Sequence, residues 1–287
     1  MASMRDIKRR KSSIQSTQQI TKAMKLVSTV KLQRAKGNAE RSRNYFSCMY
    51  DTVSSMLAKA GNIDHPYLRA GVSDRKAVIV ITSNRGLAGG YNSNIIKLIT
   101  RGELAKDQLD IYAIGKKGKD TLQRYGYTIK EDYSDVIEEP AYGDAMRISA
   151  QVLKAFTDGE IGEIYLAYTA FKNTVSHEPK LIKLLPVEAA DENASEERRD
   201  NQAPMNFEPR EEEALEMIIP KYITSLIYGG MVESVASENG ARMQAMDSAT
   251  SNAEEMIGTL ELQYNRARQG SITQELTEII AGAEAIS

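Results

Sequence analysis

The sequence predicts an α/β protein in which a long antiparallel coiled coil, formed by the two ends of the chain, carries an inserted α/β domain. All seven prolines of the 287-residue chain lie between Pro66 and Pro220, and both proline-free ends show helical periodicity. Proline removes a backbone donor and clashes with the preceding helical turn, so stretches without it can form unbroken helices. Each end would then span on the order of 80–100 Å at about 1.5 Å per residue. Helices of that length need each other as packing partners.

The C-terminal end carries the clearer repeat. Its least polar positions follow the alternating three- and four-residue spacing of a left-handed coiled-coil seam. They are Met243, Met246, Thr250, Ala253, Ile257, Leu260, Tyr264 and Ala267.

The N-terminal end has a more polar seam. Lys11, Gln18 and Thr21 occupy seam positions, and a seam this polar gives up stability that a Leu/Ile seam would supply. The alternative is an ordinary long helix packed on its own domain. The apolar residues that fit the repeat are Met4, Ile7, Ile14, Met24 and Val27.

Charge separates the two ends. Residues 1–45 contain twelve Lys/Arg and two Asp/Glu, a formal charge of +10, whereas residues 238–287 contain three Arg and eight Asp/Glu, a formal charge of −5. A basic helix beside an acidic one favours antiparallel pairing of these two helices. Because each exposed ion pair contributes only about 0–1 kcal/mol, charge selects the partner more than it stabilises the pair. The surplus positive charge predicts a further acidic partner, or else a solvated lysine face.

The composition fits a soluble cytosolic protein with one modest core. The chain is 26% charged and 6% aromatic and has no Trp. Its single cysteine, Cys48, excludes an internal disulfide and any metal site built from several cysteines. No apolar run approaches the roughly 18–20 residues that cross a bilayer. The basic N-terminus lacks the apolar centre of a signal peptide, so we interpret it as mature structure.

The middle of the chain predicts the inserted domain. Two β-branched strands, at 76–82 and 110–115, are followed by helices near 92–101 and 116–124, and a further helix is expected at 145–156. Two more strands, 164–171 and 181–187, are joined by a turn around Asn173. Alternating strands and helices are typical of a Rossmann-like α/β layered domain. We therefore expect a coiled-coil helix over 1–65, the inserted domain over 74–190, an acidic linker or foot over 191–219, and a second coiled-coil helix over 220–287.

The glycine-rich stretch Ser83–Asn92 lies between a predicted strand and a predicted helix. That arrangement is one way of holding a phosphate group. However, Gly86, Gly89 and Gly90 do not form the G-x-G-x-x-G fingerprint, and the chain contains no G-x-x-x-x-G-K-[ST] sequence. A tight turn that needs glycine for its backbone explains the stretch more simply. The two histidines, His65 and His177, are far apart in sequence, so we expect no catalytic site in this chain.

Several blocks resemble the gamma subunit family of F-type ATP synthases. They are Met4–Arg10, Thr17–Val27, the Ser83–Asn92 stretch, Ala241–Met246 and Tyr264–Ile279. The blocks occur in the family's order at both ends and at the first strand, so the resemblance spans the chain.

The resemblance implies a rotor. Gamma subunits form the central stalk, with one copy per complex, inside a hexamer of three alpha and three beta subunits. Their α/β domain lies beside the epsilon subunit and above the membrane-embedded c-ring. Rotation couples ion flow through the ring to ATP synthesis or hydrolysis, and gamma also regulates ATPase activity. The family implies a non-catalytic chain without a cofactor, since nucleotide and Mg²⁺ belong to alpha and beta. It also implies a peripheral position on the cytoplasmic side of the cell membrane.

The resemblance also implies partner contacts. Lys22, Met24 and Lys25 match the part of the N-terminal helix that faces acidic loops of the beta subunits. Phe207 and Glu208 resemble the foot that touches the c-ring. The final turns, with Leu276, Ile279, Ile280, Ala283 and Ile286, would slide in an apolar sleeve. The C-terminal residues that match contacts with the alpha/beta ring or the partner helix are Arg242, Arg268, Gln269, Thr273 and Glu275.

The sequence departs from the family at a few positions. Ala88 and Asn84 replace a cysteine and an aspartate that are frequent in the glycine-rich stretch, so we expect neither side chain to be essential to the fold. The cysteine pair of chloroplast-type relatives is absent, so one thiol cannot form an intramolecular redox switch. Asp247 and Ser251 also differ from the family, without an evident role.

Two other classes of function remain as alternatives. The basic N-terminal segment is the kind of electrostatic footprint that nucleic-acid-binding proteins use. Tyr45, Phe46 and Tyr50 follow the basic run rather than alternating with it, so no stacking surface is expected. The third possibility is a nucleotide-binding enzyme built around Gly86–Gly90.

Overall fold

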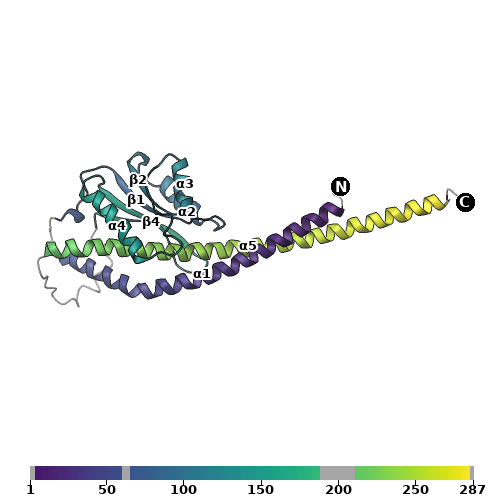
Figure 1. Ribbon diagram of the computed structural model, residues 1–287, viewed down its shortest axis with the longest axis horizontal. Coiled ribbons are helices and arrows are strands. Elements are labelled where there is room, and N and C mark those ends of the chain that lie inside the picture. Colours follow the sequence, from purple (N-terminus) through teal and green to yellow (C-terminus); the bar gives the residue numbers. More distant parts are fainter. Residues whose placement is uncertain (1–3, 60–64, 188–210, 285–287) are drawn as a thin grey trace. The chain divides into compact units, whose positions relative to one another are not determined.

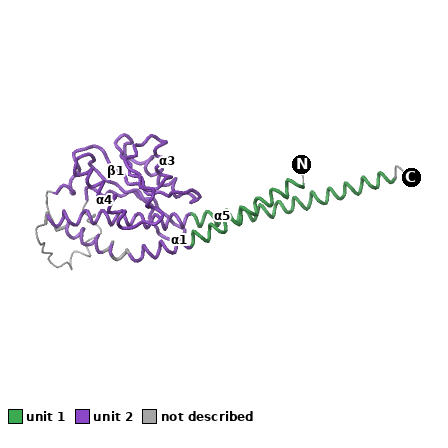
Figure 2. The backbone as a smooth tube through the Cα atoms, in the orientation of Figure 1, with its two compact units in different colours: residues 1–29, 242–287 green, residues 30–241 purple. Residues whose placement is uncertain are grey.

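The computed structural model describes residues 4–59, 65–187 and 211–284. The long helices α1 (Met4–Lys59) and α5 (Glu211–Glu284) come from the two ends of the chain. The chain divides into two compact units, Met1–Thr29 with Arg242–Ser287 and Val30–Ala241, and each long helix contributes residues to both (Figure 2). We call the first unit the rod and the second the α/β domain. The α/β fold with long terminal helices is confirmed.

In the rod, α1 and α5 run antiparallel to each other (Figure 2). The seam predicted for α5 is confirmed, because Met246, Ala253 and Leu260 are buried and the other five positions are partly buried. The polar seam positions of α1 are confirmed as well: Thr21 is buried, and Lys11 and Gln18 are partly buried.

The seam of α1 differs from the prediction after Thr21. Val27 is 58% exposed, whereas its neighbour Ser28 is only 2% exposed. The strict repeat therefore continues through Lys25 and Ser28, not through Met24 and Val27. The sequence pattern favoured the apolar residues, but the geometric period of the helix pair decides which positions face the partner.

The α/β domain is built on a five-stranded sheet with the order β3-β2-β1-β4-β5. The strands β1 (Lys76–Ile81), β2 (Leu109–Ile114), β3 (Thr128–Asp132) and β4 (Glu163–Phe171) are parallel, whereas β5 (His177–Leu185) pairs with β4 in the antiparallel sense. Every residue of β2 is buried and only Lys76 of β1 is partly exposed, as expected for central strands of a parallel sheet.

Helices cover both faces of the sheet (Figure 1). On one face, α4 (Tyr142–Thr157) and the residues Leu215, Ile219, Ile223, Ile227 and Met231 of α5 belong to a single buried apolar cluster with the strands. On the other face, α2 (Tyr91–Thr100) and α3 (Lys116–Arg124) form a second cluster with them. Two short 3₁₀ helices, Pro66–Leu68 and Lys106–Gln108, complete the described elements.

The sequence missed some of these elements. It gave no sign of β3, whose sequence TIKED has no apolar cluster and alternates between exposed and partly buried residues. It also started β5 at Leu181, four residues late. The turn at Asn173 is confirmed, since its side-chain oxygen accepts hydrogen bonds from the backbone amides of Val175 and Ser176, at 2.9 and 2.7 Å.

The start of α5 differs from the expected boundary at 220. The helix begins at Glu211 and runs through Pro220, so residues 211–219 belong to the helix and not to a linker. Ile219 and Ile223, on either side of the proline, are fully buried in the apolar cluster. Packing of this face outweighs the local cost of proline, which is about 3 kcal/mol in a helix interior.

Candidate protein–protein interface

Polar side chains connect the two helices of the rod. Thr21 and Thr250 share a hydrogen bond of 2.8 Å between their hydroxyl oxygens. Lys11 Nζ donates to Glu261 Oε1 at 2.8 Å, and Lys25 Nζ donates to Asp247 Oδ1 at 2.5 Å. All three contacts fit one antiparallel register. Polar groups at a seam fix register because a shifted pairing would leave them without partners.

Lys25 of α1 and Asp247 of α5 form an ion pair within the rod. The resemblance implies that Lys25 faces an external partner, and this contact stays a prediction. In the described chain its ammonium group pairs with Asp247 of α5, and both side chains remain partly exposed. Asp247, which had no evident role, supplies the carboxylate. Ser251 is exposed, and nothing in the structure explains its difference from the family.

The other matched residues of the rod lie at or near its surface. Lys22 is exposed and Met24 is partly buried. Arg242 is also partly buried. The four matched residues nearer the end of α5 are all exposed: Arg268, Gln269, Thr273 and Glu275. Phe207, Glu208 and Ile286 lie outside the described residues.

Two helix surfaces of the rod expose apolar side chains. On α1, Ile20, Leu26 and Val27 are each more than half exposed, a feature that the sequence reasoning missed by placing Val27 in the seam. On α5, the predicted apolar tip is exposed at Leu276, Ile279 and Ile280, and Ile272 continues it. Exposed apolar groups gathered in this way are typical of surfaces that other molecules cover.

The first turns of α1 carry a basic face. Arg5, Lys8, Arg9 and Arg10 are exposed, and Arg9 approaches Asp6 at 3.6 Å. An acidic partner could approach this face at little desolvation cost, since the cations remain in water until contact.

The glycine-rich stretch forms a tight turn whose polar groups are internally bonded. Asn92 Oδ1 accepts from the Ser83 amide at 2.9 Å. The turn contains Leu87 at φ 62° and Gly89 at φ 54°, in the left-handed region where glycine costs least. This geometry supports the structural interpretation of the stretch over phosphate binding.

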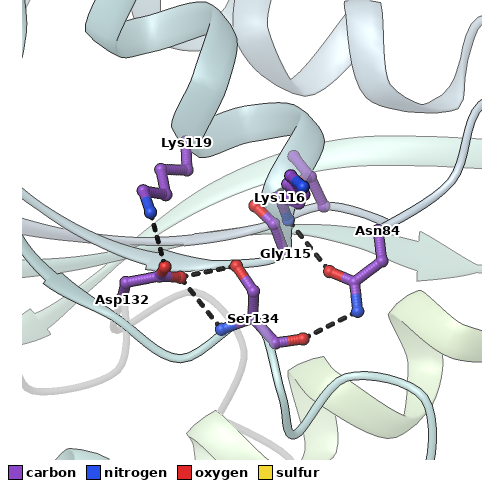
Figure 3. A network of polar contacts seen from close by, with 7 residues as sticks. Asn84, Gly115, Lys116, Lys119, Asp132 and Ser134 are labelled. Carbon is purple, nitrogen blue, oxygen red and sulfur yellow. Dashed lines mark hydrogen bonds and ion pairs between the residues drawn. The ribbon is translucent and has the colours of Figure 1, made fainter.

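Asn84 joins this turn to the next two strand ends (Figure 3). Its Oδ1 accepts from the Lys116 amide at 3.0 Å, at the start of α3, and its Nδ2 donates to the Ser134 carbonyl at 2.7 Å. The Ser134 amide and hydroxyl both donate to Asp132, which also binds Lys119. The Asn84 side chain thus bonds the first amide of α3 and holds a neighbouring loop; whether the fold needs it stays a prediction. Ala88 is buried, where its small side chain fits.

The carboxylate of Asp132 is the centre of this network. Burial alone would raise the pKa of Asp132, but hydrogen bonds from Lys119 and from the Ser134 hydroxyl and amide outweigh it and lower the pKa. Within the described residues, no three His, Cys, Asp or Glu side chains gather as a metal site would require. The same ranges contain no helix that is both long and apolar enough to span a membrane.

Comparisons with known proteins bear on the whole chain. The family model described as ATP synthase matches residues 3–286. The ATP synthase gamma chain of Lachnoclostridium phytofermentans is 67% identical over 291 aligned positions and is covered completely, as is this chain. The ATP synthase gamma chain, sodium ion specific, of Acetobacterium woodii is 39% identical, with 99% of each chain covered. Neither relative bears a nucleic-acid-binding name.

Solved structures agree in fold. A chain of the Tetrahymena thermophila mitochondrial ATP synthase central stalk and c-ring structure matches with a TM-score of 0.59 at 26% identity, covering 80% of this chain and 99% of that one. A chain of the Euglena gracilis mitochondrial ATP synthase matches with a TM-score of 0.69 at 18% identity, covering 99% and 94%. With a family model and a closely similar relative that both span its length, this chain belongs to the ATP synthase gamma chain family.

Proposed function

We propose that this chain is the central-stalk rotor subunit of an F-type ATP synthase. It transmits rotation between an ion-driven c-ring and a hexamer of three alpha and three beta subunits, and so couples ion flow to ATP synthesis or hydrolysis. The family match over residues 3–286 carries this proposal. The chain acts without chemistry of its own, because nucleotide and Mg²⁺ belong to the alpha and beta partners.

The rod suits this task for a physical reason. A shaft must turn without its two helices sliding past each other, and the contacts Thr21–Thr250 and Lys25–Asp247 oppose sliding. Two helices have no threefold symmetry, so a ring of three equivalent subunits meets a different surface at each position. Contacts that differ between successive orientations shift the conformational equilibrium, and hence the nucleotide affinity, of each beta subunit.

The surfaces of the rod suggest which partner each part meets. The basic face and the exposed Lys22 fit acidic loops of the beta subunits, with Met24 beside them. The apolar tip at Leu276, Ile279 and Ile280 fits an apolar sleeve, where no directional bond must break at each step. Arg242, Arg268, Gln269, Thr273 and Glu275 are proposed contacts of the C-terminal helix.

The remaining partners belong to the α/β domain and the segment before α5. We assign the epsilon subunit to that domain and the c-ring to Phe207 and Glu208. One copy of the chain serves each complex, on the cytoplasmic side of the membrane and attached peripherally. As the rotor of the complex, the chain would also regulate the rate of ATP hydrolysis by the alpha and beta subunits.

A rotation assay tests the role directly. Cys48 is the only cysteine, and its side chain is exposed on α1, so a maleimide can fix one bead or fluorophore to the full chain. In a surface-immobilised alpha–beta hexamer assembled with this chain, ATP should drive stepwise rotation of the probe in one direction. Cys48→Ser provides the unlabelled control. A stationary probe on complexes that hydrolyse ATP at the normal rate would refute the proposal.

A charge reversal tests the proposed beta contact. Lys22→Glu should lower the number of ions pumped per ATP hydrolysed in reconstituted vesicles, because an acidic loop would then face a carboxylate. Lys154→Glu makes the same change at an exposed position of α4 and serves as the matched control. Equal ion-to-ATP ratios for the two variants would remove Lys22 from the interface while leaving the rotor role intact.

A further inference from the structure

The end of β4 extends past its neighbour β1. The pairing of β1 with β4 ends at Val80 and Ala167, whereas β4 continues to Phe171. The backbone groups on that side of β4 then need other partners, since buried amides and carbonyls are almost always hydrogen-bonded. The helix α5 supplies them with side chains.

Three side chains of α5 bond the β4 backbone beyond the end of β1, on the side that β1 no longer reaches. Ser234 Oγ accepts from the Thr169 amide at 3.2 Å, and Ser237 Oγ donates to the Thr169 carbonyl at 3.1 Å. Glu233 Oε2 accepts from the Phe171 amide at 3.2 Å. Beyond the apolar cluster that β4 and β5 share with α5, the end of the β4–β5 hairpin is therefore held to α5 by polar contacts.

The ring of His177, at the start of β5, packs against Phe171 and Gly240. Its ring lies 5.9 Å from the ring of Phe171, between centroids. It also lies so close to Gly240 of α5 that a Cβ atom at this glycine would approach His177 Cε1 to 2.7 Å. Gly240 is thus required for the close approach. We call the group Thr169, Phe171, His177, Gly240 and the three α5 side chains the hairpin junction.

Several buried polar atoms at or near the hairpin junction lack a hydrogen-bond partner among the described residues. Both ring nitrogens of His177 are buried, and within the described residues neither makes a hydrogen bond. Thr169 Oγ1 and Asn239 Oδ1 are also buried without a partner there. Burial lowers the pKa of His177 from its ordinary value, and the nearby Thr174 carbonyl offsets this only in part. The neutral imidazole is therefore the form that fits.

We propose that the hairpin junction is pH-sensitive, so that a proton taken up by His177 loosens the β4–β5 hairpin from α5. An imidazolium carries a charge and two N–H donors, and the junction offers these donors little water and only the nearby Thr174 carbonyl as an acceptor. The charge is relieved when the hairpin opens and water reaches the ring. Local opening of this kind needs no unfolding of the sheet.

The charged groups around the junction leave His177 without a counter-ion. Glu178 is bonded to Lys172 at 2.6 Å, and Glu233 to the Phe171 amide. The next charged residues along α5, Glu238 and Arg242, each have interactions of their own. Protonation therefore adds an uncompensated charge.

The sign of the pH dependence follows from linkage. Because the pKa of His177 is lower in the closed junction than in the open one, the open form binds more protons in the window between the two values. Closure is fully favoured above the ordinary histidine pKa, about 6.5, and is lost progressively as the pH falls through the lowered value. Within that window the opening constant rises by up to about tenfold per pH unit.

Hydrogen exchange of the full chain tests the proposal. After correction for intrinsic exchange rates, the amides of Thr169 and Phe171 should exchange faster at pH 5 than at pH 7.5. The rise should be confined to pH values below about 6.5 and reach at most about tenfold per pH unit. His177→Phe keeps a ring against Phe171 but cannot titrate, so its exchange at these amides should not depend on pH. His65→Asn, which retains an acceptor for the Tyr67 amide, is the matched control and should behave like the original chain.

Two outcomes would overturn the proposal. One is an equal acid response in His177→Phe and the original chain. The other is an NMR titration of the original chain in which the His177 ring takes up its proton at pH 6.5 or above, with no change at Thr169 or Phe171. The second measurement needs no variant and stands even if His177→Phe fails to fold.

Discussion

Lys25 of α1 and Asp247 of α5 form an ion pair across the rod, with 2.5 Å between Nζ and Oδ1. Their side chains are 39% and 57% exposed, so solvent screens the pair and it contributes about 0–1 kcal/mol. The ion pair therefore fixes the register of α1 against α5 more than it raises the free energy of unfolding. We expect Lys25→Asp to place two carboxylates opposite each other, and the exchanged pair Lys25→Asp with Asp247→Lys to restore the contact.

A double-mutant cycle checks this relationship. Denaturant unfolding of the four chains should give a coupling free energy of about 0.5–1 kcal/mol, with the exchanged pair near the original stability. In assembled complexes, the ion-to-ATP ratio should fall for each single variant and recover in the exchanged pair. Additive single effects would show that the two residues act independently.

Removing the hydroxyl pair of Thr21, which is buried, and Thr250, which is partly buried, is expected not to lower the stability of the rod. Each hydroxyl can also donate to a carbonyl of its own helix, Gln18 or Met246. Replacing both threonines by valine leaves no polar group unpaired and makes the seam apolar, so we expect the unfolding free energy to stay level or to rise by about 1 kcal/mol. Unfolding in urea measures the change. A loss above 1 kcal/mol would contradict this account of the seam.

The side-chain amide of Asn84 should contribute more to the free energy of unfolding than an ordinary turn residue does. Asn84→Ala removes the cap of α3 and the bond to the Ser134 carbonyl, so we expect a loss of about 1–2 kcal/mol in thermal or urea unfolding. Ser93→Ala, at an exposed position nearby, is the control and should change stability by less than about 0.5 kcal/mol. Similar losses in both variants would remove the special role of the amide.

The network beside Asn84 predicts an acid-sensitive component of stability. The pKa of Asp132 is lowered in the folded chain, so its contribution is present above the ordinary aspartate pKa, about 3.9, and is lost as the pH falls below it. Asp132→Asn should therefore be less stable than the original chain at pH 6, and the difference should shrink toward pH 3. Urea midpoints at several pH values measure this. A constant difference would assign the effect to hydrogen bonding alone.

The ion pair of Arg75 with Asp110 should contribute more to the free energy of unfolding than the exposed ion pairs do. Asp110 is 1% exposed at the start of β2 and accepts hydrogen bonds from both Nε and a terminal nitrogen of Arg75. Arg75→Ala would leave a buried carboxylate without its cation. Because the Arg75 side chain is itself 44% exposed, we expect about 2–3 kcal/mol, below the 3–5 kcal/mol of fully buried pairs. The combined change Arg75→Met with Asp110→Leu should recover part of this loss in the same unfolding assay.

Much of the fold could be predicted from local patterns. The seam of α5 follows a strict period, and a helix pair buries whatever lies on that period, so all eight positions are at least partly covered. The strands β1 and β2 are apolar and β-branched, as buried parallel strands require. β3 and the start of β5 form strands because they pair with β2 and β4, and no local window of sequence contains both partners.

The partner contacts of the rod stay predictions, because those at Lys22 and on the exposed face of α5 rest on the family's motifs alone. The local geometry around them could not be predicted from the sequence. That Lys25 pairs with Asp247 and that Asn84 bonds Lys116 and Ser134 each depend on a residue more than 30 positions away.

The sequence by itself determined that the two ends form long helices of opposite charge around an α/β domain, because helix period, proline placement and charge are local properties of the chain. Only the tertiary structure decided the register of those helices, the passage of α5 through Pro220, and the polar junction between β4 and α5. These depend on which distant groups can satisfy one another's hydrogen bonds and fill one another's packing space, and that choice is made when the whole chain has folded.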